Sequence, residues 1–144
     1  MKTRVVERSE LYSIVSGFPF TPVVGILLVG DRLSCCDEGI VVEDDGRVVA
    51  VATIAPDGEE GSGEPTIVAC YVLRADRRKG FGRACMTAAV ERCCARGFAR
   101  VRVDAVSTGG LRLNQSLPEE LREILDIHDM TSGVDLDFLE SLMS

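Results

Sequence analysis

The chain has 144 residues, 46% of them hydrophobic and 27% charged, with a formal net charge of −7. This length and balance suit one globular domain, residues 1–144, with a single core. The negative charge argues against general nucleic-acid binding, which needs a basic face toward the phosphates. The apolar run Val23–Val29 is far shorter than the ~20 residues that cross a bilayer, and charges near Met1 argue against a signal peptide. We expect a cytoplasmic protein that binds neither nucleic acid nor a membrane.

Cysteine and histidine usage argues against a metal site. The six cysteines form no Cys-x-x-Cys pair, and His128 is the only histidine, so a zinc site is not expected. Cys70, Cys85 and Cys93 stand in apolar surroundings, where cysteine usually behaves as a small buried hydrophobe. Without a secretion signal, reduced thiols are expected.

The N-terminal half predicts helices followed by a hairpin. A mixed polar and apolar pattern allows a short helix over Glu7–Ser16, and Pro22–Leu33 fits a second helix or a buried strand. Gly39–Glu43 and Arg47–Ile54 are β-rich runs joined by an Asp-Asp-Gly turn, which predicts a β-hairpin. Ala55–Pro65 is predicted to be an exposed acidic loop.

The C-terminal half predicts alternating strands and helices. Thr66–Leu73 is expected to be a central strand, and Gly82–Arg96 a helix buried around most of its girth, with Gly97 just after its end. Arg100–Val106 alternates apolar and polar residues and predicts a strand with one half-buried face. Pro118 and acidic residues then predict a helix over Glu119–Ile127, and the acidic tail has room for a short helix near Val134–Leu142.

The segment from Arg74 to Arg83 concentrates positive charge around two glycines. It reads Arg-Ala-Asp-Arg-Arg-Lys-Gly-Phe-Gly-Arg and holds five of the sixteen basic residues of the chain. Cations at a helix N-terminus oppose the helix dipole, so an anionic partner is expected there. Exposed amides, the dipole and basic side chains favour phosphate, and Gly80 and Gly82 let a pyrophosphate approach the backbone. The alternative is a solvated basic turn whose glycines serve only their dihedral angles.

Two other phosphate-binding motifs fit the same segment less well. A Walker loop needs a lysine after its glycines, whereas Lys79 precedes them. A dinucleotide fingerprint needs a third glycine where Cys85 stands, and Asp104 lies where its acidic residue would be wanted. However, six residues separate the strand from Gly80, and a dinucleotide turn would follow the strand at once.

At these residues the sequence resembles the GNAT superfamily of acetyl-CoA-dependent N-acetyltransferases. The pyrophosphate motif of this family, Gln/Arg-x-x-Gly-x-Gly/Ala, follows a strand and opens a helix, and residues 77–82 read Arg-Arg-Lys-Gly-Phe-Gly. Val72 occupies the apolar position five residues before the motif. The resemblance covers about Gly39–Pro118, the implied acetyl-CoA-binding core, with residues 119–144 as a helical, acidic extension. It implies an α/β (α+β) fold, a mixed, mainly antiparallel central sheet flanked by helices, whose fourth and fifth strands splay apart.

The resemblance also implies roles for individual residues. Acetyl-CoA is the implied cosubstrate, and the main chain from Val72 to Arg74 would pair with its pantetheine arm as an added strand. The Val72 amide would polarise the thioester carbonyl, which is an oxyanion-hole role. The amides from Arg78 to Arg83 would hold the pyrophosphate. The cofactor-binding residues predicted in this way are Val72, Leu73, Arg74, Arg77, Arg78, Lys79, Gly80, Phe81, Gly82, Arg83 and Asn114.

The implied general acid and base depart from the pattern of the family. Members often carry an Asn after the fifth strand and, seven residues later, a Tyr that protonates the departing thiolate; Asn114 occupies the second position here. Asn114 can hydrogen-bond the sulfur or the pantetheine but is not an acid, so Ser116 or a water is an alternative donor. The Glu that some members place eleven residues before the motif is replaced by Thr66, and Glu64 is the predicted substitute. A solvated loop carboxylate is the alternative reading of Glu64.

The C-terminal end of the chain departs furthest from the pattern of the family. The family normally closes with a β-hairpin that walls the acceptor site, whereas residues 119–144 predict a helix and an acidic tail. The acceptor pocket is therefore expected to be open, rebuilt from the N-terminal segment, or completed by a second subunit in a homodimer. The implied activity is acetyl transfer from acetyl-CoA to an amine, and the acidic balance favours a cationic acceptor such as a polyamine, a lysine side chain or a protein N-terminus. The alternatives are a catalytically weak module that binds acetyl-CoA or CoA, and an interaction protein without the cofactor.

Overall fold

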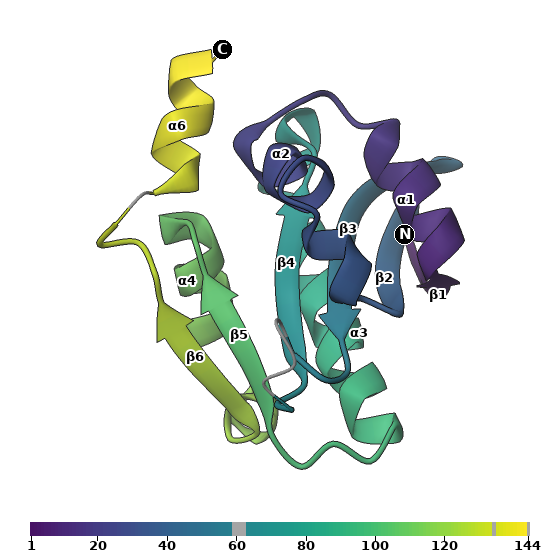
Figure 1. The fold of residues 1–144 in the computed structure, drawn as a ribbon, viewed down its shortest axis with the longest axis vertical. Helices are drawn as coiled ribbons and strands as arrows, with labels where there is room; N and C mark the ends of the chain where they lie inside the picture. The colour runs from purple at the N-terminus through teal and green to yellow at the C-terminus, as the bar shows by residue number, and fades with distance from the viewer. Residues whose placement is uncertain (59–62, 134, 144) are drawn as a thin grey trace.

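The computed structural model describes residues 1–58, 63–133 and 135–143, and its six strands form one sheet in chain order. The strands are β1 (Lys2–Glu7), β2 (Glu38–Asp44), β3 (Arg47–Ala55), β4 (Thr66–Val72), β5 (Val101–Ala105) and β6 (Leu125–Asp129). Strands β1 to β4 pair antiparallel, whereas β4–β5 and β5–β6 pair parallel. The predicted mixed, mainly antiparallel sheet is confirmed (Figure 1).

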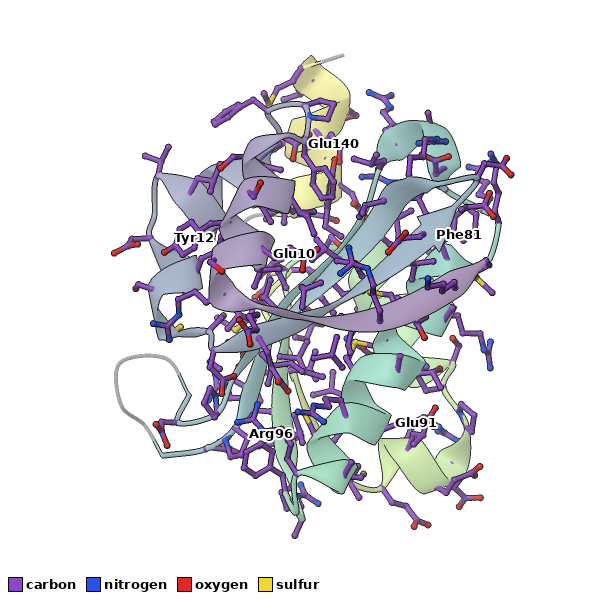
Figure 2. The ribbon with its side chains drawn as sticks, turned by 90° about the vertical axis from the view of Figure 1, so that its right-hand side faces the viewer. Glu10, Tyr12, Phe81, Glu91, Arg96 and Glu140 are labelled. Atoms are coloured by element: carbon purple, nitrogen blue, oxygen red, sulfur yellow. The ribbon has the colours of Figure 1, made fainter. Side chains whose placement is uncertain are left out.

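Helices cover both faces of this sheet. They are α1 (Arg8–Ser16), α2 (Pro22–Leu28), α3 (Phe81–Ala95), α4 (Thr108–Gln115), α5 (Glu119–Arg122) and α6 (Leu136–Met143), with the short 3-10 turns η1 (Arg32–Cys35) and η3 (Arg74–Asp76). On one face, α1 and α2 enclose a cluster that includes Leu11 and Val51; on the other, α3 buries Met86 and Ala89. Figure 2 shows α1, which carries Tyr12, and α3, which carries Phe81, on opposite sides of the strands. Each face therefore has its own apolar core.

The predicted buried helix is α3. Its small residues let it lie close to the sheet, and two arginines near its end fix it to β2: Arg92 bonds Glu38 at 2.7 Å, and Arg96 bonds Asp37 at 2.8 Å. The helix starts one residue earlier than expected, at Phe81, and Gly97 follows it with a φ of 90°. Because β4 leads into α3 through a tight loop, α3 points its N-terminus at the end of β4.

The N-terminal elements agree with the sequence in part. The helix over Arg8–Ser16 and the hairpin of β2 and β3 are confirmed, and Pro22–Leu33 begins as helix α2, not as a strand. The first strand, β1, was not predicted. It is an edge strand in which Val6 alone is buried, so its sequence lacks the alternation that marks a half-buried strand. Within the predicted acidic loop, residues 59–62 lie outside the described residues.

The C-terminal prediction is wrong in one element. The expected helix over Glu119–Ile127 ends at Arg122, and Leu125–Asp129 forms strand β6, parallel to β5 over its whole length. The edge of β5 opposite β4 offers main-chain hydrogen bonds to Leu125–Asp129, and this ladder overrides the local helical signal. The later helix α6 starts at Leu136; Val134, where it was expected to begin, is outside the described residues. After β6, residues 130–133 and 135–143 contain no further strand.

Among the described residues, no helix is both long and apolar enough to cross a bilayer. In the same part of the chain, no three His, Cys, Asp or Glu side chains lie close enough together to hold a metal ion.

Candidate functional site

Strands β4 and β5 separate part-way along their length. Within the described strands, they pair only through Thr66 and Ile67 of β4. The next residue, Val68, is an extra residue with no partner in the register with β3, which makes it a β-bulge. A bulge bends its strand and ends pairing locally. The two strands therefore diverge toward their C-terminal ends, and the predicted splay is confirmed.

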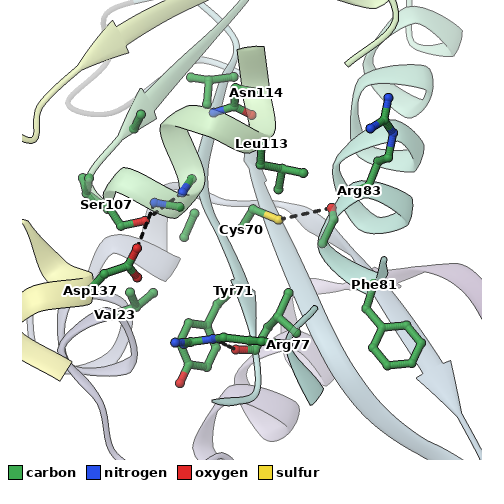
Figure 3. A pocket seen from close by; sticks show the side chains of 18 of the residues that line it. Val23, Cys70, Tyr71, Arg77, Phe81, Arg83, Ser107, Leu113, Asn114 and Asp137 are labelled. Atoms are coloured by element: carbon green, nitrogen blue, oxygen red, sulfur yellow. Dashed lines mark hydrogen bonds between the residues drawn. The ribbon is translucent and has the colours of Figure 1, made fainter. Parts of the chain in front are cut away.

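A pocket of about 440 Å³ opens where the strands diverge (Figure 3). On the α3 face, its basic end is lined by Arg78, Gly80, Phe81, Gly82 and Arg83. On the face of α2 and α6, its acidic end is lined by Val23, Tyr71, Asp104, Asp137 and Glu140. The pocket therefore passes through the sheet and joins two regions of opposite charge.

The basic end is shaped by two glycines. Gly80 is the N-cap of α3 and has a φ of 85°, a backbone conformation that residues with a side chain rarely adopt. A Cβ atom at Gly80 would meet no described atom within 4 Å. At Gly82, a Cβ atom would lie 3.2 Å from Cγ2 of Val72 and 3.3 Å from Cδ2 of Leu113. No described side chain forms a hydrogen-bonded cap at Gly80, so amides of the first turn of α3 are available to an anion.

A buried carboxylate holds the loop before α3 in place. Asp76 is 2% exposed and accepts a hydrogen bond from Nη1 of Arg47 at 3.0 Å, and Nζ of Lys79 lies 3.8 Å from it. The hydrogen bond with Arg47 lowers the pKa of Asp76, so the carboxyl group is ionised at neutral pH. The loop is thus tied to β3 and does not depend on a ligand for its shape.

The main chain of β4 presents alternate groups to the pocket. The Leu73 amide donates to the Val49 oxygen of β3 at 2.9 Å. Since neighbouring residues of a strand point their amides in opposite directions, the amides of Cys70 and Val72 face β5 and the pocket. Leu73 thus pairs with β3, packs on the α1–α2 face and is not among the residues that line the pocket. Its cofactor contact remains a prediction.

Asn114 carries a polar atom that lacks a partner. It lies on α4, lines the pocket and is 4% exposed, and its Oδ1 atom is buried without a hydrogen bond. A buried carbonyl oxygen in this state costs about 1–3 kcal/mol relative to a satisfied one. A ligand that donates a hydrogen bond from within the pocket would remove that cost.

The other predicted site residues differ in whether they line the pocket. Arg74 and Lys79 are exposed and do not line the pocket, and Arg77 lines it but turns toward Tyr71 and the acidic end. Glu64, the predicted general base, is not part of the lining either. It precedes β4, at the end where β4 and β5 are still paired, whereas the pocket lies toward the other end of the strand. Glu64 is therefore not placed to take a proton from a group in the pocket.

The sequence analysis missed the residues of the acidic end. Tyr71 lies on β4 with its hydroxyl 3.3 Å from Oε1 of Glu140, and burial raises the pKa of that hydroxyl, so it is protonated at neutral pH. Asp104 bonds Arg102 at 2.8 Å, and Asp137 accepts from the Gly109 amide at 2.9 Å. The alternation of β5 gave a signal for Asp104, but nothing in the sequence indicated that α6 would fold back onto this pocket.

The sequence model of the acetyltransferase (GNAT) family matches residues 18–112, about two thirds of the chain. The chain therefore belongs to the GNAT family of acetyltransferases. No curated protein sequence matches it significantly.

Solved structures share the fold at low sequence identity. A ribosomal-protein-alanine N-acetyltransferase from Brucella melitensis biovar Abortus 2308 is 17% identical with a TM-score of 0.54, over 80% of this chain and 89% of its own. An aminoglycoside acetyltransferase from an uncultured soil metagenomic sample, in complex with trehalose, is 17% identical with a TM-score of 0.56, over 83% and 88%. An aminoglycoside N-acetyltransferase in complex with CoA is 16% identical with a TM-score of 0.54, over 81% and 90%. At these identities the likeness concerns the fold.

Proposed function

We propose that this protein is an N-acetyltransferase that binds acetyl-CoA at the basic end of the pocket and receives an amine at the acidic end. The observation that carries the proposal is a pocket between two splayed strands, with glycine-exposed amides and cations at one end and carboxylates at the other. A donor and an acceptor that enter from opposite faces of the sheet would meet between β4 and β5. Bringing them together there supplies much of the rate acceleration.

The residues at the basic end fit coenzyme A. Its diphosphate would lie against the first-turn amides of α3, with Arg78 and Arg83 as counter-charges. The pantetheine arm carries amide N–H groups, which match the unpartnered Oδ1 of Asn114. Bound there, acetyl-CoA would supply an activated thioester. The Val72 amide is then the group of this chain that would stabilise negative charge on the thioester oxygen.

The acidic end indicates the chemical class of the acceptor. Carboxylates of Asp104, Asp137 and Glu140 line it, and two of the three have a guanidinium partner while Asp137 has a main-chain amide. The negative charge of these carboxylates favours an amine that carries positive charge, such as a polyamine, a lysine side chain or a protein N-terminus. The similar structures named for aminoglycosides and for ribosomal-protein alanine agree with an amine acceptor. We propose that one of these carboxylates takes the proton that the amine loses.

Two measurements test the proposal. Calorimetric titration with acetyl-CoA should show binding by the wild type, and an Arg78→Glu variant should bind at least about tenfold more weakly because it places a negative charge beside the diphosphate. Thiol release should then be followed with spermidine, lysine methyl ester, an alanyl peptide and kanamycin. The absence of binding by the wild type would overturn the proposal. Binding without release from any amine would instead support the CoA-binding module.

A further inference from the structure

Arg77, the first residue of the pyrophosphate motif, does not point at the basic end. Its Nε atom donates to the main-chain oxygen of Val72 at 3.1 Å, and its guanidinium lies 5.4 Å from the ring centroid of Tyr71. Its Nη2 atom bonds Oε2 of Glu140 at 2.8 Å. The contacts with Tyr71 and Glu140 lie toward the acidic end, and Figure 3 shows the Arg77 side chain lying across Tyr71, away from Arg83.

Glu140 belongs to α6, the last helix of the described residues. Leu136 and Glu140, four residues apart on one side of α6, are each 7% exposed, whereas Phe138 is 63% exposed. The helix therefore docks through a single stripe. Figure 1 shows it above the ends of β4 and β5, and it contacts α2 and α4.

The start of α6 is fastened to α4. Asp137 accepts a hydrogen bond from the Gly109 amide at 2.9 Å, and Asp135 accepts one from the Thr108 amide at 3.4 Å and another from its hydroxyl. Carboxylates at a helix N-terminus are favoured by the helix dipole. This end of α6 therefore has an attachment of its own, and the contact of Glu140 with Arg77 and Tyr71 is a second attachment, next to the pocket.

We propose that α6 is the wall of the acceptor site and that Arg77 is a positioning residue for it, acting through Glu140. The inference rests on the proposed function. A carboxylate as buried as that of Glu140 needs a compensating partner, and Arg77 is the cation that the structure places against it. When a neutral side chain replaces Arg77, Glu140 turns toward water and α6 leaves the pocket. Arg77 thus sets the affinity for the amine, although its place in the sequence marks it as a cofactor residue.

The test compares Arg77→Gln with Arg78→Gln, its neighbour at the basic end. For Arg77→Gln we expect the dissociation constant of acetyl-CoA, measured by calorimetry, to change by less than about twofold, and the KM of the best amine in the panel to rise about tenfold. For Arg78→Gln we expect the dissociation constant of acetyl-CoA to rise about tenfold and the KM of the amine to change by less than about twofold. Amides of residues 136–143 should exchange hydrogen faster in Arg77→Gln and at the wild-type rate in Arg78→Gln.

Two further variants guard against a general folding defect. Glu140→Gln keeps the size of the side chain and should reproduce the effects of Arg77→Gln, while Arg77→Lys keeps a cation for Glu140 and should recover part of the amine affinity. The inference is overturned if Arg77→Gln weakens acetyl-CoA as much as Arg78→Gln does, or if exchange in α6 is unchanged. It is also overturned if the wild type binds acetyl-CoA but acetylates no amine of the panel. Failure of the wild type to bind acetyl-CoA would refute the proposed function itself.

Discussion

Gly82 and Val72 face each other across the basic end of the pocket, so closely that a Cβ atom at Gly82 would stand 3.2 Å from Cγ2 of Val72. Gly82 lies in the first turn of α3, and Val72 is the last residue of β4. The absence of a side chain at Gly82 lets the start of α3 pack directly against Val72 and Leu113. Gly82 is thus required by the space available and not by its dihedral angles.

Gly82→Val should disturb this contact. We expect the affinity for acetyl-CoA to fall by about tenfold or more, because a branched side chain would have to displace Val72 or Leu113. Calorimetric titration measures the loss. The control is Gly133→Ala, since a Cβ there has no described neighbour nearer than 3.9 Å and the residue lies outside the pocket lining. Equal affinities in the two variants would refute this account of Gly82.

Asn114→Leu should separate stability from binding. Replacing a buried carbonyl that lacks a partner with an apolar group of similar size should raise the free energy of unfolding of the free protein by about 1–2 kcal/mol. The same change removes the acceptor that a pantetheine amide would use, so the affinity for acetyl-CoA should fall. Urea unfolding and calorimetry measure the two effects. A variant that loses stability and keeps its affinity would show that Asn114 serves the fold alone.

Cys70 provides a chemical probe of the groove. Its sulfur lines the pocket, 4.0 Å from the Gly82 oxygen, whereas Cys94 is exposed at the far end of α3. Acetyl-CoA, which has no free thiol, should slow the reaction of Cys70 with N-ethylmaleimide about tenfold when present at ten times its dissociation constant. Cys94 should react at an unchanged rate. Peptide mass spectrometry follows both sites, and equal protection or none would place the cofactor elsewhere.

Asp76→Asn should make the loop before α3 less stable in a pH-dependent way. The folded-state pKa of Asp76 is lowered by Arg47, and that of an unfolded aspartate is about 3.9. The stabilisation is therefore complete above about pH 4 and is lost as the pH falls through the folded-state pKa. The free energies of unfolding of wild type and variant, from urea titrations, should differ by a constant amount between about pH 5 and 7 and converge at lower pH. A difference that widens on acidification would contradict the assignment.

Local signals predicted the cofactor half of the fold. Each of these signals involves residues that are close together in the sequence: the hairpin turn, the alternation of β5 and the small residues of α3. Such signals can be recognised without knowledge of the tertiary structure. Gly80 and Gly82 are likewise local signals, because each marks a position where the backbone leaves no room or no favourable conformation for a side chain. Strand β6 escaped prediction because its partner, β5, is distant in sequence and supplies the hydrogen bonds that Leu125–Asp129 uses.

The direction of side chains could not be predicted in the same way. Arg77 stands among four other basic residues, and nothing local distinguishes it from Arg78. Its partner Glu140 is 63 residues away, on a helix whose position depends on contacts with α2 and α4. The position of Glu64 relative to the pocket could not be predicted for a related reason: it depends on where β4 stops pairing with β5, which the sequence of Thr66–Val72 does not specify.

A single unpaired residue, Val68, decides where the two strands part. The opening is therefore made by backbone geometry, and the main-chain groups that line it are the same whatever side chains surround them. An opening of this kind tolerates wide changes in sequence, and a solved structure shares the fold at 17% identity. Under the proposed function, exchanging the C-terminal helix for another segment is a practical route to new amine preferences on an unchanged donor half.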